Sequence, residues 1–349
     1  PSSHPIMRVL SASESISPAI RRTKEILFQP FHKGSSWKLA AVAYLSAMGL
    51  AFMPYPLFVF AIPKPPNTET VHMNLILAAF GLVSSAVMFV FFYLGSRLQF
   101  VLFAFTLEKS TTIAPLWRRY ASRTWPWLGL KLILSLVVTA IFALPVFHSA
   151  HILMSQTSVQ QPGQPPSPEM FAALLSFYVV LLAPVCLLLL CSSLLSDFVL
   201  PPIALEDASL TDALGRFFRL IKAEPGQLLL FTLFKVLLAI AGMMIMQVVV
   251  ILAELVLLIP TGLLALLGWF LFRSLGPSGH ILLFAVALTL GLVFLAVMFY
   301  IMVLIMGCIH TFYQAYALYF LGGRYPQLGD LLEPPALPSA ELPPLPHPS

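Results

Sequence analysis

Four histidines have the type and spacing that could hold a metal ion or a haem: His72, His148, His151 and His280. Each is expected at the outer end of a membrane-spanning stretch. His148 and His151 are three residues apart, so a helix places both rings on one face, which suits a metal ion. Histidines from two different helices could instead hold a haem. The alternative is that each ring lies at the membrane interface with one end in water, because no Cys or carboxylate clusters with them.

A second candidate site is a set of basic side chains on amphipathic helices. In the polar stretch from Asp197 to Gly226, Ser209 and Asp212 form a capping box that predicts the start of a helix. Apolar residues then recur at spacings of three and four, and basic residues occupy the other face. Similar stretches occur near residues 17–22 and 113–118. Helices of this kind lie among lipid headgroups and attract anionic lipid. The residues predicted to face lipids or partner proteins are Arg22, Arg118, Arg216, Arg219 and Lys222.

The amino-acid composition indicates whether these helices lie in water or in a lipid bilayer. Hydrophobic residues make up 59% of the chain and charged residues only 9%, whereas about a quarter of the residues in a soluble globular protein are charged. Six apolar runs are long enough to cross about 30 Å of hydrocarbon. They are expected to be helices, because lipid offers no partner for an unpaired backbone group. The sequence therefore predicts an all-α polytopic membrane protein with six transmembrane helices and three amphipathic helices at the cytoplasmic face.

The basic residues are distributed unevenly about these runs. All Lys and Arg except Lys64 and Arg273 fall on one side. Because basic residues are enriched in cytoplasmic loops, both termini are expected in the cytoplasm, and the protein in the cytoplasmic (inner) membrane. The net charge of +5 then reflects topology and does not indicate binding to nucleic acid. Three cysteines, all within apolar runs, indicate neither a disulfide framework nor a zinc site.

The order of amphipathic helix, apolar run, break and apolar run occurs three times. In the resulting alignment Arg22, Arg118 and Arg216 coincide, although the identities are few and chance is the alternative. The prolines near the end predict an extended segment. The predicted segments are a flexible leader (1–14), a single membrane domain (15–321) with pseudo-repeats 15–107, 110–205 and 208–321, and a Pro-rich cytoplasmic tail (322–349).

The fifth apolar run, Leu228 to Phe272, is about twice as long as the roughly 20 residues of one crossing. Glu254 and Pro260 interrupt it. Two ordinary spans would move the C-terminus to the outer side, against the distribution of basic residues. We therefore expect one span to about Ala253, followed by a re-entrant helix or a helix on the outer interface over residues 255–272.

Two pairs of segments carry a resemblance to a known group of proteins. Residues 93–97 (YLGSR) lead to 117–120 (WRRY), and residues 197–199 (DFV) lead to 217–220 (FFRL). Over residues 10–321 the chain resembles bacterial multi-pass membrane proteins that are similar to the membrane domain preceding some glycerophosphodiester phosphodiesterases. The resemblance implies a bacterial inner membrane. The phosphodiesterase catalytic domain is absent, so no catalytic residue carries over.

The function is inferred from sparse signals. No nucleotide, nucleophile-elbow or zinc-protease motif occurs. A transporter or permease would place polar residues along a path and often uses inverted repeats, whereas these repeats would be parallel. An enzyme would use the four histidines as an outer-face metal site. We favour a non-enzymatic scaffold or accessory subunit that binds anionic lipid headgroups or other membrane subunits. No cofactor is assigned. His310, Tyr313 and Tyr316 could form a site on one helix face or belong to the aromatic belt.

Overall fold

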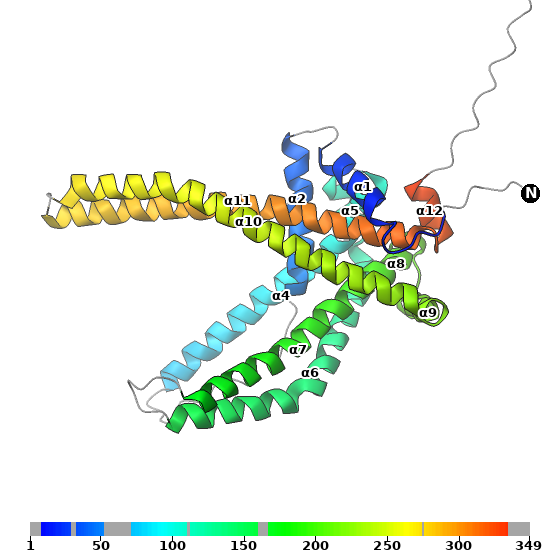
Figure 1. Cartoon of the computed structure of the whole chain (residues 1–349), viewed down its shortest axis with the longest axis horizontal. Coiled ribbons are helices and arrows are strands. Elements are labelled where there is room, and N and C mark those ends of the chain that lie inside the picture. Colours follow the sequence, from blue (N-terminus) through cyan, green and yellow to red (C-terminus); the bar gives the residue numbers. More distant parts are fainter. Residues whose placement is uncertain are drawn as a thin grey trace, which may run out of the picture. The chain divides into compact units, whose positions relative to one another are not determined.

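The structure is a computed structural model, and the part of the chain that it describes is helical (Figure 1). Within this part no strand occurs, and five helices are long and apolar enough to cross a membrane. The predicted all-helical membrane class is therefore confirmed. The residues described are 8–28, 33–51, 71–109, 112–159, 167–273 and 276–333.

The helices follow the alternation of short polar and long apolar stretches in the sequence. In chain order they are α1 (Ile16–Phe28), α2 (Lys33–Ala51), α4 (Val71–Glu108), α5 (Ile113–Arg119), α6 (Ala121–Val159), α7 (Pro168–Phe198), α8 (Leu200–Glu206), α9 (Leu210–Ala223), α10 (Pro225–Phe272), α11 (Gly276–Gly322) and α12 (Pro326–Leu332). The predicted start of α9 is confirmed, because the hydroxyl of Ser209 accepts the backbone N–H of Asp212 at 3.2 Å.

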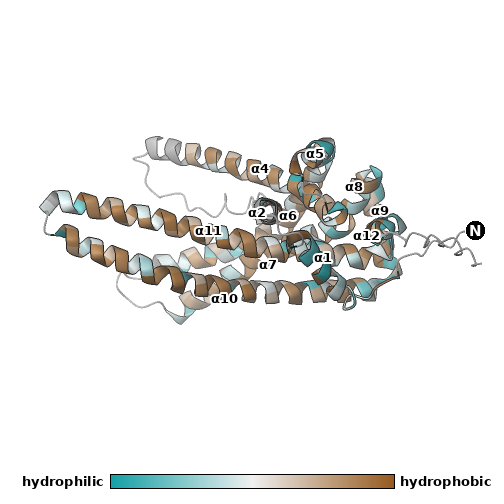
Figure 2. Cartoon of the chain, turned by 90° about the horizontal axis from the view of Figure 1, so that it is seen from above, coloured by the Kyte–Doolittle hydropathy of each residue, from teal (hydrophilic) through white to brown (hydrophobic). Residues whose placement is uncertain are grey.

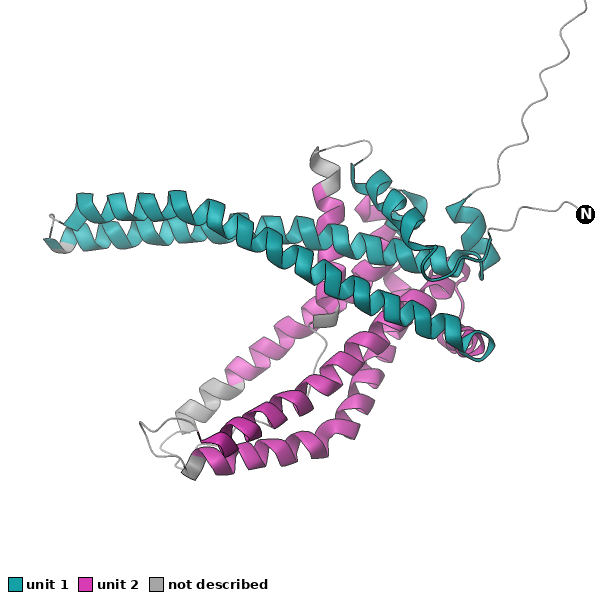
Figure 3. Ribbon diagram, viewed as in Figure 1, with its two compact units in different colours: residues 1–36, 104–110, 221–349 teal, residues 37–103, 111–220 magenta. Residues whose placement is uncertain are grey.

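The chain divides into two compact units (Figure 3). Unit 1 comprises residues 1–36, 104–110 and 221–349, and unit 2 comprises residues 37–103 and 111–220. Each unit contains one long helical hairpin, α10–α11 in unit 1 and α6–α7 in unit 2. The fold of each unit is therefore described by itself.

In unit 1, α10 and α11 lie side by side (Figure 1) and are apolar along most of their length (Figure 2). With 48 and 47 residues, each is about 70 Å long. Aromatic rings join the two helices near α1: the Phe231 ring stacks on Tyr316, with 5.0 Å between their centroids. The Tyr313 hydroxyl donates to the Leu238 carbonyl at 2.9 Å. α1 and α12 pack against α11.

The predicted break in the fifth apolar run is wrong, because α10 continues to Phe272 without interruption. Pro260 removes one backbone donor inside the helix. The carbonyl that loses its donor is that of Val256, four residues earlier. The neighbouring Thr261 hydroxyl donates to the Leu257 carbonyl at 2.7 Å, and a proline is tolerated in an apolar helix where small local adjustments satisfy the freed carbonyl. Residues 255–272 are thus part of α10 and not a separate re-entrant or interfacial helix.

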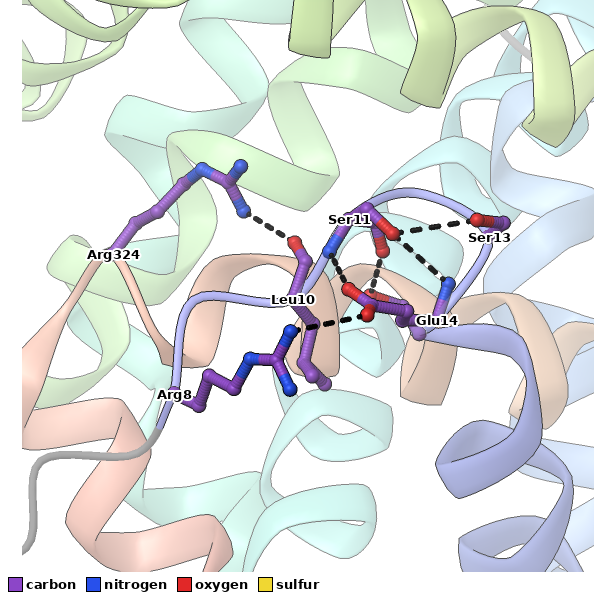
Figure 4. A network of polar contacts seen from close by, with 7 residues as sticks. Arg8, Leu10, Ser11, Ser13, Glu14 and Arg324 are labelled. Atoms are coloured by element: carbon purple, nitrogen blue, oxygen red, sulfur yellow. Dashed lines mark hydrogen bonds and ion pairs between the residues drawn. The ribbon is translucent and has the colours of Figure 1, made fainter.

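The predicted flexible leader and extended tail are both folded where the structure describes them. The Glu14 carboxylate accepts the backbone N–H of Ser11 at 2.8 Å, which closes a turn before α1 (Figure 4). The Arg324 guanidinium donates to the Leu10 carbonyl at 3.0 Å (Figure 4). Pro326 then opens α12, whose Leu328 and Leu332 are buried. The abundance of proline beyond α12 concealed this apolar spacing of four residues. The remainders of the two predicted segments, 1–7 and 334–349, lie outside the described residues.

In unit 2, three helices meet in an apolar cluster of Phe92 from α4, Leu128 and Val138 from α6, and Leu188 from α7. α2 and α4 also cross with their backbones in direct contact. A Cβ atom built on Gly49 would lie 2.6 Å from the Cα atom of Gly95. Only glycine fits on both sides, which is how small residues let helices approach closely in membrane proteins.

Candidate functional site

Three of the four predicted histidines have described side chains, and all three are exposed. His148 and His151 are both exposed on α6, and His280 is exposed near the start of α11. His72 lies in α4, but its side chain is not among those described. Among the described residues, no group of three His, Cys, Asp or Glu could hold a metal ion. A metal site with three or more such ligands is therefore not found among the described residues, and a haem held by two histidines stays a prediction.

The predicted basic residues fall into three different environments. Arg118 on α5 and Arg219 and Lys222 on α9 are exposed. Arg216 is half-buried and forms an ion pair with Glu206 at 2.6 Å. Arg22 is buried, with 6% of its surface exposed, so the prediction that it faces lipid or a partner is wrong. Its position explains this result, because Ala19, Arg22 and Thr23 share the buried face of α1.

Arg22 stabilises the end of a helix. Its Nε donates to the Thr106 carbonyl at 3.0 Å, and its Nη2 donates to the Leu107 carbonyl at 2.7 Å. The last carbonyls of a helix have no partner within it, so the guanidinium caps α4. Burial lowers the pKa of Arg22 from its ordinary value, but an arginine remains charged at neutral pH. Beside it, the hydrogen bond from Lys109, with 2.7 Å between Nζ and Oε2, holds the pKa of Glu25 below its ordinary value.

Two other arginines donate to carbonyls in the last turn of a helix, Arg123 from another helix and Arg324 from the residue four places after the carbonyl. Arg123 donates to the Ala204 carbonyl at 2.6 Å in the last turn of α8 and forms an ion pair with Asp207. Arg324 donates to the Phe320 carbonyl at 2.7 Å in the last turn of α11. Thr106 and Ala204 each stand two residues before a glutamate, Glu108 and Glu206. The residues after these glutamates are Lys109 and Asp207, whose φ angles of 50° and 56° are both left-handed.

We expect Arg22→Ala to destabilise the protein by about 2–3 kcal/mol, because it leaves two carbonyls at the end of α4 without their charged donor. Thermal unfolding of the purified protein in detergent measures this loss. The matched control is Arg118→Ala, which removes an exposed arginine and should change stability by less than about 0.5 kcal/mol. Equal effects of the two substitutions would contradict the capping role.

A buried lysine in unit 2 forms a polar cluster that the sequence analysis missed. Lys131 of α6 is 0% exposed. Its Nζ donates to Gln99 Oε1 at 2.6 Å and to Ser96 Oγ at 3.3 Å. Gln99 Oε1 also accepts the indole N–H of Trp127 at 3.0 Å. The ammonium nitrogen lies 5.2 Å from the Trp127 ring centroid, within the range of a cation–π contact.

None of the ion pairs between described residues involves Lys131. Buried charges in proteins are ordinarily paired, because removal from water is costly. The signal in the sequence was the spacing: Leu128, Lys131, Ser135 and Val138 follow one face of a helix. The sequence analysis did not use this spacing, and it treated Lys131 only as one of the basic residues that indicate the membrane topology. Chemically, the cluster can fix the packing of α4 on α6 or attract an anion.

The first turns of α1 border a shallow hollow of about 560 Å³. Arg21 and Lys24 supply positive charge there, and Ser13 and Ser17 supply hydroxyls. Arg21 also lies 3.8 Å from Glu333, but both side chains are largely exposed, so this ion pair is weak. Ile16 and Ile20 complete the lining of the hollow.

The comparisons with known proteins give a family but no described relative. No curated protein and no solved structure matches the chain. One family profile matches residues 10–331. The match begins in the turn before α1 and extends into α12, so it includes both segments that Arg324 joins. Because it spans most of the sequence, the chain belongs to the family of unknown function DUF7544.

Proposed function

We propose that this chain is a non-enzymatic scaffold or accessory subunit of a cytoplasmic membrane that binds anionic lipids or partner proteins through its short basic helices. It crosses the membrane six times, with both termini in the cytoplasm. The five long apolar helices support the membrane location. The sixth span includes residues outside the described part of the chain.

The exposed surface of α9 is the observation that carries the proposal. Phe218 is 57% exposed and stands directly before the exposed Arg219, with the exposed Lys222 one turn further on. Neither cation is among the ion pairs of the described residues. An apolar ring beside free cations is the composition that enters the headgroup layer and attracts anionic groups.

The proposal extends to a threefold pseudo-repeat of amphipathic helix and helical hairpin. Two helix ends that accept an arginine from an earlier helix support the first two copies: Arg22 at α4 and Arg123 at α8. The left-handed residues Lys109 and Asp207 support the register of the first two copies. α1, α5 and α9 each precede one apolar hairpin in the sequence, so they would begin the three copies on the same side of the membrane.

The test is a charge-reversed variant that carries Arg118→Glu, Arg219→Glu and Lys222→Glu. The matched control carries Arg118→Lys, Arg219→Lys and Lys222→Arg, which keep the charge. Both are purified by affinity tag in mild detergent, and the bound proteins and lipids are identified. Each basic residue near an anionic leaflet contributes about 1 kcal/mol of attraction. We therefore expect the reversed variant to lose at least about tenfold of its anionic lipid or a bound protein, and the control to lose neither. An unchanged set in the reversed variant would overturn the proposal.

A further inference from the structure

Polar side chains from three helices of unit 2 lie next to its apolar cluster. On α6, Lys131 and Ser135 fall between Leu128 and Val138, which both belong to that cluster. On α4, Ser96 and Gln99 follow the cluster residue Phe92 by one and two turns, and on α7 Ser192 follows the cluster residue Leu188 by one turn. All are 7% exposed or less. We call this set the buried polar layer: Ser96, Gln99, Lys131, Ser135 and Ser192.

The buried polar layer has more donors than acceptors. The ammonium of Lys131 has three N–H donors, of which two are used, on Gln99 and Ser96. Both lone pairs of Gln99 Oε1 are occupied, by Lys131 and by Trp127. The Ser192 hydroxyl is buried and has no hydrogen-bond partner among the described residues. One N–H of Lys131 and the hydroxyl hydrogens of Ser96 and Ser192 therefore remain to be accepted.

When Lys131 is protonated, the layer also carries one uncompensated positive charge. No carboxylate of the described residues pairs with Lys131. Its two oxygen partners are a neutral amide and a neutral hydroxyl, and its ring contacts are to Trp127 and Phe92. At low dielectric an unpaired charge is strongly unfavourable, and an opposite charge nearby is strongly favourable. A water molecule would accept the free donors but would not neutralise the charge.

We propose that the buried polar layer binds one small monovalent anion of the size of chloride. The Lys131 ammonium supplies the counter-charge, and the hydroxyls of Ser96 and Ser192 complete the donor set. A monovalent anion makes the layer neutral, whereas sulfate or phosphate would bring a second negative charge into an apolar surrounding. The 3.3 Å contact between Lys131 and Ser96 is long for a hydrogen bond, so the Ser96 hydroxyl can turn towards the anion.

The test uses the full chain purified in detergent and exchanged into sodium gluconate. Sodium chloride or sodium bromide then replaces gluconate at constant ionic strength, and the thermal midpoint is measured. Ligands that bind only the folded state raise that midpoint in a saturable manner. We expect both halides to raise it by several degrees with saturation, whereas sulfate should give only the non-saturable rise that an excluded salt produces. Chloride retained through the exchange is measured by ion chromatography after denaturation, and about one chloride per chain is expected if exchange is slow.

The decisive variants change the layer and a comparable lysine elsewhere. Lys131→Met should abolish the halide response and the retained chloride. Lys235→Met is the matched control, because Lys235 also lies beside a ring four residues earlier, Phe231, and it should keep both. If Lys131→Met does not fold, Ser192→Ala keeps the lysine and should raise the half-saturating halide concentration about tenfold. A halide response that persists in Lys131→Met, or the absence of both response and retained chloride in the unmodified protein, overturns the proposal.

Discussion

Replacing Gln99 with leucine is expected to destabilise the protein by about 3–5 kcal/mol. The amide oxygen of Gln99 accepts from the Lys131 ammonium at 2.6 Å and from the Trp127 indole at 3.0 Å. Leucine would leave a fully buried cation and a buried N–H without this acceptor. Removing one partner of a buried charge is costly for that reason, far more than the net contribution of the hydrogen bond itself. Unfolding in detergent and sodium gluconate measures the loss without halide.

A double-mutant cycle with Lys131→Met separates this cause from a simple change of shape. Methionine has a similar length and no charge, so Lys131→Met alone should leave stability in gluconate unchanged or raise it by up to about 1.5 kcal/mol. In the Gln99→Leu background it should restore at least about 2 kcal/mol, since the remaining cost is the unpaired indole N–H. Additive effects of the two substitutions would show that the Lys131 charge is not what makes Gln99 important.

The sequence predicted the class of the fold, because the apolar composition and the capping residues of each stretch are enough to make that stretch a helix. Long apolar runs must form helices in lipid, and the capping residues Ser209 and Asp212 mark the start of α9. The errors arose where distant parts of the chain decide the outcome. Arg22 has the composition of a lipid-facing residue, but its partners are the carbonyls of Thr106 and Leu107. The turn before α1 is held by Arg324, more than three hundred residues away.

The candidate site was harder to predict than the fold. Lys131 looked like one more basic residue near a helix start, since periodicity shows that a residue shares a face with Leu128 but not what lies opposite. Its environment is set by Gln99 and Ser96 on another helix. At Lys131 the deciding contact is therefore a side-chain hydrogen bond between helices, which spacing along the chain does not specify. The continuation of α10 through Pro260 was also missed, because a proline inside an apolar helix either ends or merely bends it and the sequence alone does not say which.

The glycine pair where α2 crosses α4 leads to the second large effect. We expect Gly49→Ala to destabilise the protein by about 2–3 kcal/mol, because the added methyl group would lie 2.6 Å from the Cα atom of Gly95 and 2.8 Å from its carbonyl carbon. Backbone atoms cannot turn away as a flexible side chain can, so the two helices must separate. The Gly95→Ala substitution should have a similar effect, since its methyl group meets the backbone of Gly49. Thermal unfolding in detergent measures both.

The control for the glycine pair is Gly129→Ala on α6, where a Cβ atom would meet nothing within 4 Å. Alanine is favoured over glycine inside a helix by about 1 kcal/mol, so this variant should be as stable as the unmodified protein or more so. The same preference for alanine acts at Gly49, so the steric contact with Gly95 alone makes the Gly49→Ala substitution destabilising. Separating α2 from α4 would also lengthen the 3.4 Å hydrogen bond from Gln99 to the Ser46 carbonyl. Gly49→Ala should therefore weaken the polar cluster around Lys131, and stabilisation by Gly49→Ala would show that the two helices do not cross at these glycines.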